Sequence, residues 1–195
     1  MRRAYAALFA VALANAAGSA PAAAEPLPTA DAYRQIDFAD GRGRLTARYA
    51  PVEPPPADSR EIKVLQTPTG VGAGTAGARL LSEAAEGFRR RAEQDCHDAQ
   101  ARTLEASSPS GDAATAVEIV CEGFDPVSSD GRESPENSYL YARFELLRDT
   151  LVVMTYQWRS RAAPAQAVVA SDLLTREVKP TLARLRLKLA ARLAD

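Results

Sequence analysis

Histidine and cysteine are scarce in this sequence. Its 195 residues include one histidine, His97, and two cysteines, Cys96 and Cys121. One histidine excludes a site built from several histidine ligands, and a catalytic triad that needs histidine would have to use His97. A nucleophile elbow of the G-x-S-x-G type is also missing. These absences favour a non-catalytic role and predict no metal site and no cofactor.

Neither sign of charge is in excess. The chain carries 24 lysines and arginines against 25 aspartates and glutamates, so its net charge is −1. Nucleic-acid-binding proteins usually have a marked basic excess. Nucleic acid is therefore not an expected partner.

Long hydrophobic runs are missing after the first residues, which have the features of a signal peptide. Two arginines follow the first methionine, residues 4–17 are mostly apolar, and residues 22–24 form an A-x-A cleavage pattern. Residues 1–24 are thus predicted to be removed on export to a bacterial periplasm or beyond it. No later segment approaches the roughly 18 apolar residues of a transmembrane helix. The mature protein is expected to be soluble, with a mobile lead-in over residues 25–32.

The two cysteines fit an exported protein. In an oxidising compartment, two cysteines of one small domain usually form a disulfide. A reactive thiol or a metal pair is the alternative, but the chain has no C-x-x-C spacing and zinc requires about four ligands. We therefore expect a Cys96–Cys121 bridge that ties the end of a helix to a strand.

The pattern of apolar residues predicts one α+β domain over residues 33–195. Strands are predicted by alternation, and helices by apolar residues three and four positions apart. The predicted strands cover residues 36–38, 45–49, 61–67, 102–106, 115–122, 139–147 and 150–159, and the predicted helices cover residues 78–95 and the region from Ser171 onward, with a kink at Pro180. Hairpins dominate, so we expect a largely antiparallel sheet of about six to seven strands covered by two helices. In its order of elements the chain resembles the PsbP-like α+β sandwich, although no residue motif carries that resemblance.

A glycine-rich segment before the first helix matches the dinucleotide-binding pattern G-x-G-x-x-G. Residues 68–71 separate it from the preceding strand, and the later strands pair as hairpins rather than as a parallel sheet, so a dinucleotide site is not expected. The same segment could still bind a simple anion. Free N–H groups at a helix start can bind an anion, here with Gly72, Gly74 and Thr75, and Thr75 could cap the helix.

Two features suggest a surface for a partner. Tyr156 and Trp158 lie on one face of the last strand and would form a contact surface if exposed. Arg184 and Lys188 belong to a basic amphipathic last helix, which could bind a protein partner or an anionic membrane surface. The alternative is that this helix packs on the sheet through its leucines and its charges face solvent.

Taken together, the sequence favours a non-catalytic accessory or binding module of the cell envelope, with a protein partner or a small ligand. Two alternatives remain open. One is an exported hydrolase that uses a pair of carboxylates. The other is an inhibitor of a foreign enzyme that presents the loop at residues 125–137.

Overall fold

A computed structural model describes residues 33–41, 44–52, 58–106, 113–124, 136–160 and 174–192. The expected signal peptide, the lead-in at residues 25–32 and most of the loop expected at residues 125–137 lie outside the described residues, whereas residues 136 and 137 belong to a strand. Within the described part of the chain, no helix is both long enough and apolar enough to cross a membrane.

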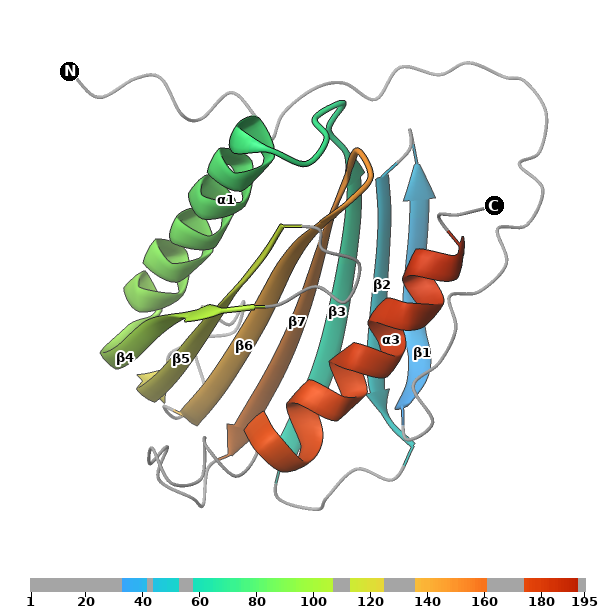
Figure 1. Ribbon diagram of the computed structural model, residues 1–195. Helices are drawn as coiled ribbons and strands as arrows, with labels where there is room; N and C mark the ends of the chain where they lie inside the picture. The colour runs from blue at the N-terminus through green and yellow to red at the C-terminus, as the bar shows by residue number, and fades with distance from the viewer. Residues whose placement is uncertain are drawn as a thin grey trace, which may run out of the picture.

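The described residues form a single seven-stranded sheet and two helices (Figure 1). The strands are β1 (Tyr33–Gly41), β2 (Arg44–Pro51), β3 (Asp58–Pro68), β4 (Cys96–Glu105), β5 (Ala114–Phe124), β6 (Glu136–Leu147) and β7 (Thr150–Ser160), and the main helices are α1 (Thr75–Gln94) and α3 (Lys179–Arg192). The order in the sheet is β1-β2-β3-β7-β6-β5-β4, and all neighbours are antiparallel. The predicted α+β class with an antiparallel sheet is therefore confirmed. The resemblance to the PsbP-like layout stays a prediction from the order of elements.

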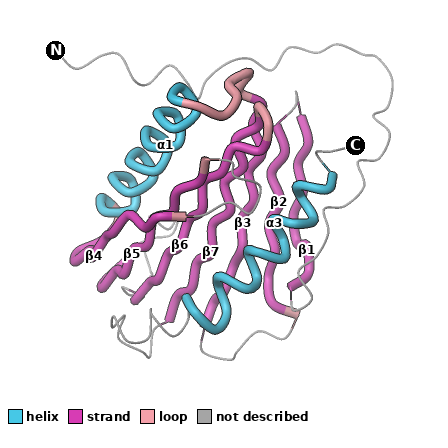
Figure 2. The backbone as a smooth tube through the Cα atoms, viewed as in Figure 1, coloured by secondary structure: helices cyan, strands magenta, loops and turns pink. Residues whose placement is uncertain are grey.

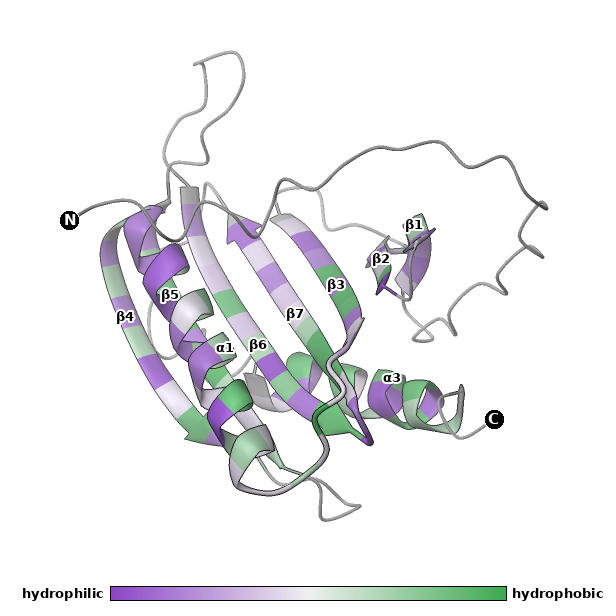
Figure 3. Cartoon of the chain, turned by 90° about the horizontal axis from the view of Figure 1, so that it is seen from above, coloured by the Kyte–Doolittle hydropathy of each residue, from purple (hydrophilic) through white to green (hydrophobic). Residues whose placement is uncertain are grey.

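The two helices pack on opposite faces of the sheet. Successive side chains of a strand point to opposite faces, and β5 and β6 are buried on both. One buried cluster joins α1 to the sheet: Leu81, Ala85, Ala92, Val117, Ile119, Leu140, Ala142, Phe144 and Leu146. The larger cluster includes α3 and the opposite face: Tyr33, Leu45, Tyr49, Ile62, Val64, Met154, Tyr156, Trp158, Val178, Leu182, Leu185 and Leu189. Figure 3 shows hydrophobic and hydrophilic residues alternating along strands such as β4.

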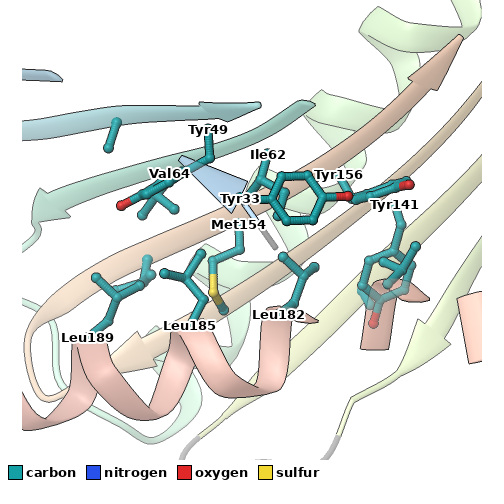
Figure 4. Close-up of a cluster of buried hydrophobic side chains, with 14 of the residues drawn as sticks. Tyr33, Tyr49, Ile62, Val64, Tyr141, Met154, Tyr156, Leu182, Leu185 and Leu189 are labelled. Carbon is teal, nitrogen blue, oxygen red and sulfur yellow. The ribbon is translucent and has the colours of Figure 1, made fainter. Parts of the chain in front are cut away.

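Each helix covers a different part of the sheet. In Figure 1, α1 lies beside β4, β5 and β6, whereas α3 crosses in front of β1, β2 and β3. Figure 4 shows Leu182, Leu185 and Leu189 pointing from α3 towards Met154 and the neighbouring strands. The part of the α3-side face that belongs to β4 and β6 therefore lies next to the flank of α3 rather than beneath it.

The first helix begins three residues earlier than predicted. Its N-cap is Gly74, with a φ of 118°, and no side chain caps it, so the predicted capping role of Thr75 is wrong. Gly77 explains part of the glycine-rich sequence. A Cβ atom on Gly77 would lie 2.6 Å from the carbonyl oxygen of Gly72 and 2.7 Å from a methyl carbon of Leu146. The glycine thus allows the first turn of α1 to pack closely against β6.

The segment before α1 is hydrogen-bonded to the turn of the β6–β7 hairpin. Thr69 donates to the carbonyl of Asp149 through both its backbone N–H (2.8 Å) and its hydroxyl (2.7 Å). Figure 2 shows this loop beside the turn that joins β6 and β7. In that turn Arg148 has a φ of 60°, a conformation that non-glycine residues seldom adopt.

The last helix begins with a π-helical turn, η2 (Leu174–Val178). Proline has no N–H to donate to the carbonyl four residues earlier. Pro180 therefore interrupts the regular hydrogen-bond ladder close to this turn. The predicted apolar stripe continues across it, because Val178, Leu182, Leu185 and Leu189 are all buried.

The predicted disulfide is present. The sulfurs of Cys96 and Cys121 lie 2.07 Å apart, with a Cα–Cα distance of 5.6 Å. The prediction placed Cys96 at a helix end and the following strand at residue 102, but Cys96 is itself the first residue of β4, separated from α1 by Asp95 alone. The strand starts early because it pairs with β5 from Cys96 onward. The bridge therefore fixes the point where α1 passes into the sheet.

Candidate functional site

A cavity of about 260 Å³ lies between the flank of α3 and the sheet. Its lining comes from the end of β4, from β6 and from α3: Glu105, Ala106, Tyr141, Arg143, Lys179, Leu182 and Ala183. This volume is close to the lower end of the range for small-molecule sites. The cavity therefore suits a small ligand rather than a large cofactor.

Strand and helix periodicity bring these side chains together. Tyr141 and Arg143 are two residues apart on β6 and share the face towards α3. Lys179, Leu182 and Ala183 are three and four residues apart on α3 and share one flank of the helix. The cavity lies between this face of β6 and this flank of α3.

The cavity has a buried floor and an exposed mouth. Tyr141 and Leu182 are buried and Arg143 is half-buried. Lys179 and Glu105 are exposed. A ligand entering here would pass two opposite charges and meet a mixed apolar and cationic floor.

A buried ionic cluster supports the floor. Arg186 donates to one carboxylate oxygen of Glu145 through Nε (2.7 Å) and through Nη2 (2.6 Å). Arg143 donates through Nε to the other oxygen of the same carboxylate at 3.1 Å. The side chain of Glu145 is completely buried. A buried carboxylate is stable only when it is paired and hydrogen-bonded, so Glu145 holds the two guanidinium groups in fixed positions.

A second cluster anchors the beginning of the last helix. Glu177, in the π turn, accepts hydrogen bonds from the hydroxyls of Tyr33 (2.7 Å) and Tyr156 (2.8 Å). Arg60 donates to its other oxygen at 2.5 Å. Burial raises the pKa of both tyrosines, and their hydrogen bonds to the Glu177 carboxylate raise it further. Both phenols therefore stay protonated and act as donors, which ties η2 to β1, β3 and β7.

A third buried carboxylate lies on the same face of the sheet. Glu118 of β5 accepts from the Tyr139 hydroxyl at 3.0 Å and pairs with the side chain of Arg102 on β4. Burial raises the pKa of Tyr139, as it does that of Tyr141. Glu118, Glu145 and Glu177 are thus each bound by at least one arginine.

The predicted anion-binding loop is exposed. Gly72, Gly74 and Thr75 all face solvent at the start of α1. The carbonyl of Gly74 accepts the first helical hydrogen bond, from the N–H of Ala78. Nothing in the structure adds a ligand-directed side chain to this loop, and its anion-binding role stays a prediction.

Of the four residues of the predicted partner surface, two are buried and two are exposed. Tyr156 is fully buried and Trp158 is 3% exposed, which contradicts the exposure on which a contact surface of these rings depended. They are buried because their face of β7 lies in the core that α3 covers. Arg184 and Lys188 are exposed on α3, and their role in partner binding stays a prediction. The side chain of His97 lies outside the description.

The sequence reasoning missed Arg143, Glu145 and Arg186. Their signal was present, because Arg143 and Glu145 continue the face of β6 that begins with Tyr139 and Tyr141. Charged residues on the inward face of a strand are rarely buried without partners. Charged residues at inward positions of a strand therefore indicate a buried ionic cluster.

Comparisons with protein-family models, with curated proteins and with solved structures find no match for this chain. The class of the protein is therefore defined by its own architecture. It is a disulfide-bonded α+β domain whose two helices pack on opposite faces of one antiparallel sheet.

Proposed function

We propose that this protein is a non-catalytic binding module of the bacterial envelope that holds a small ligand in the cavity beside α3. The observation that carries the proposal is the Glu145 cluster. It fixes Arg143 at the cavity floor through a fully buried carboxylate. A polar group whose position is fixed before binding reduces the ordering cost of association.

Export is supported by two independent features. The first 24 residues have the three-part pattern of a secretory leader. The paired cysteines are of the kind that persists in oxidising compartments. We infer a periplasmic or secreted location from them.

A hydrolase with a carboxylate pair has less support. Such an enzyme needs two acidic side chains that face one substrate. Among the described residues, Glu105 is the single carboxylate in the cavity lining. Glu145 is a buried acid two residues after Arg143 on β6, and it is hydrogen-bonded to two arginines.

Contact with a protein partner is a second candidate, favoured by one observation. Leu187, on the outward side of α3, is 60% exposed. Arg184 and Lys188, also exposed, lie close to it on the same helix. An apolar side chain among basic ones suits an acidic partner surface. Cross-linking in the envelope should then yield one dominant adduct that is lost in Leu187→Asp.

The cavity proposal is tested by screening the exported protein against a library of small metabolites. Thermal shift and native mass spectrometry would detect binding. In Ala183→Trp an indole fills the mouth from an exposed position, and Ala191→Trp is the matched control on the same helix outside the lining. We expect hits with the wild type and with Ala191→Trp, and their loss in Ala183→Trp. No hit across the library, or hits that Ala183→Trp retains, would contradict the proposal.

A further inference from the structure

We infer that the ligand is a small organic acid with one carboxylate group, which Arg143 and Lys179 hold inside the cavity. This inference rests on the proposed ligand-binding function of the cavity. The charges, the shape and the apolar wall of the lining support it.

The lining has an excess of one positive charge. Lys179 contributes one positive charge and Glu105 one negative charge, and the cluster of Arg143, Arg186 and Glu145 adds one net positive charge at the floor. Lys179 forms no ion pair with any residue that the structure describes. A single negative charge on the ligand would balance the lining, whereas a cationic ligand would increase the imbalance.

Arg143 is placed to recognise a carboxylate. It lines the cavity, its Nε donates to Glu145, and its side chain makes a further interaction as well. A guanidinium has five N–H donors in a planar fork whose geometry matches a carboxylate. Its side chain is 17% exposed, so it contacts a ligand from a partly desolvated position, where a charge-assisted hydrogen bond is stronger than in water.

The Glu145 cluster keeps this guanidinium from turning away. Arg186 occupies one oxygen of Glu145, so Arg143 is confined to the other. Glu145 and Arg186 therefore act as positioning residues for Arg143 rather than as ligand contacts.

The remaining lining suits a short hydrocarbon chain. Leu182 and the ring of Tyr141 are buried, and Ala106 and Ala183 complete the apolar wall. The volume equals that of roughly nine water molecules in the liquid, at about 30 Å³ each. A short aliphatic acid such as hexanoate has a comparable size. Glu105 at the mouth would disfavour a doubly charged phosphate of the same length.

The test uses four probes with one alkyl chain and different heads: hexanoate, hexanamide, hexylamine and hexyl phosphate. Affinities would be measured by isothermal titration with the full exported protein. We expect hexanoate to bind most tightly. Equal or tighter binding of hexanamide or hexylamine would overturn the inference, as would a preference for hexyl phosphate.

Single charge changes at the mouth provide a test that does not disturb the floor. Lys179→Gln should weaken hexanoate binding about fivefold, the scale of an exposed ion pair. Glu105→Gln should strengthen it by a similar factor, because a repulsion is removed. Lys188→Gln, at an exposed position of α3 outside the lining, is the matched control and should have no effect. Equal effects of all three variants, or effects of the opposite sign, would contradict a carboxylate in the cavity.

Arg143→Lys tests the fork itself. It keeps the charge but loses the planar pair of donors, so hexanoate affinity should fall about tenfold. Circular dichroism and urea unfolding would show that the variant is folded. Unchanged affinity in a folded variant would overturn the role of Arg143.

The two proposals fail in different ways. If library ligands are lost in Ala183→Trp but show no preference for a carboxylate, the cavity remains the binding site and the ligand class is wrong. If hexanoate binds equally well to Ala183→Trp, the cavity is not the site and both proposals are wrong.

Discussion

The two helices of this protein are attached to the same sheet by different physical means. Small residues of α1, among them Gly77, Ala85 and Ala92, pack against the sheet. The ion pairs of this helix, such as Arg79–Glu83 and Arg89–Glu86, are on its outer surface. By contrast, α3 and its π turn reach the sheet through leucines and also through partly or fully buried charges.

The difference shows where binding can arise. Close packing of small residues leaves no room for a ligand, and it needs no buried charge. Along α3, polar anchors hold the helix at both Glu177 and Arg186, and the cavity lies along the flank between the helix and β6. Buried charges thus stabilise the position of α3 and at the same time supply a fixed cation to the cavity.

The largest effect is expected from a substitution that breaks the polar attachment of α3 to the sheet. Glu145→Ala removes the partner of two arginines, one of them with a side chain only 6% exposed. Leaving such a charge unpaired should cost about 3–5 kcal/mol of unfolding free energy. Urea unfolding followed by circular dichroism would measure it.

Two further variants control this prediction. Glu145→Leu combined with Arg186→Leu should recover much of the loss, since an apolar pair can replace a buried ion pair. Glu83→Ala, which removes an exposed partner on α1, should change little. A small effect of Glu145→Ala would show that its burial is not maintained in solution.

The next effect concerns the covalent link after α1. Replacing both Cys96 and Cys121 with alanine should reduce the unfolding free energy by about 3 kcal/mol, as expected for a closed loop of this length. Thiol titration of the unfolded, unreduced protein should first show no free thiols. Two free thiols, or an unchanged unfolding midpoint in the double variant, would contradict the structural role of the bridge.

Two glycines of α1 test the close packing of this helix, because Gly77 faces the sheet closely and Gly87 does not. Gly77→Ala should destabilise the protein by about 1–3 kcal/mol, because its Cβ would overlap the Gly72 carbonyl and Leu146. Gly87→Ala meets no atom within 4 Å and should stabilise it by about 0.5–1 kcal/mol through helix propensity. Thermal unfolding of both variants checks the opposite signs. The same sign in both would mean that α1 does not lie this close to β6.

The smallest expected effect concerns the phenols that bind Glu177. Tyr33→Phe removes one of three donors to this carboxylate and should cost about 1 kcal/mol at neutral pH. Burial and the Glu177 carboxylate raise the pKa of Tyr33 above its usual value of about 10 in the folded protein. Unfolding then releases protons above pH 10, so stability should fall as the pH rises from 10 towards the folded pKa.

The pH dependence distinguishes Tyr33 from general alkaline damage. Urea unfolding between pH 9 and 11 should show a shallower decline for Tyr33→Phe than for the wild type. Identical slopes would contradict the burial of this phenol. Absorbance at the tyrosinate band would report the ionisation directly.

Much of the fold was predictable because its elements have strong local patterns. Alternation in the strands and the three- and four-residue spacing of Leu182, Leu185 and Leu189 depend on nearest neighbours in sequence. The pairing of β3 with β7 and the placement of the helices on opposite faces depend on long-range packing, which a single sequence does not encode in any local signal.

The candidate site was less predictable for the same reason. Arg143 and Arg186 are far apart in sequence and meet only when α3 crosses the sheet. The exposure of Trp158 and Tyr156 could not be predicted, because a strand pattern reveals alternate faces but not which face is covered. Charges on the inward face of β6 were the one local sign of the site.

The most direct test of the account is amide hydrogen exchange of the native protein with and without saturating hexanoate. We expect hexanoate to slow exchange in α3 and β6 and to leave exchange in α1 unchanged. Slowed exchange confined to α1, or no change in α3, would contradict the claim that the binding site lies in the half of the molecule held by buried charges.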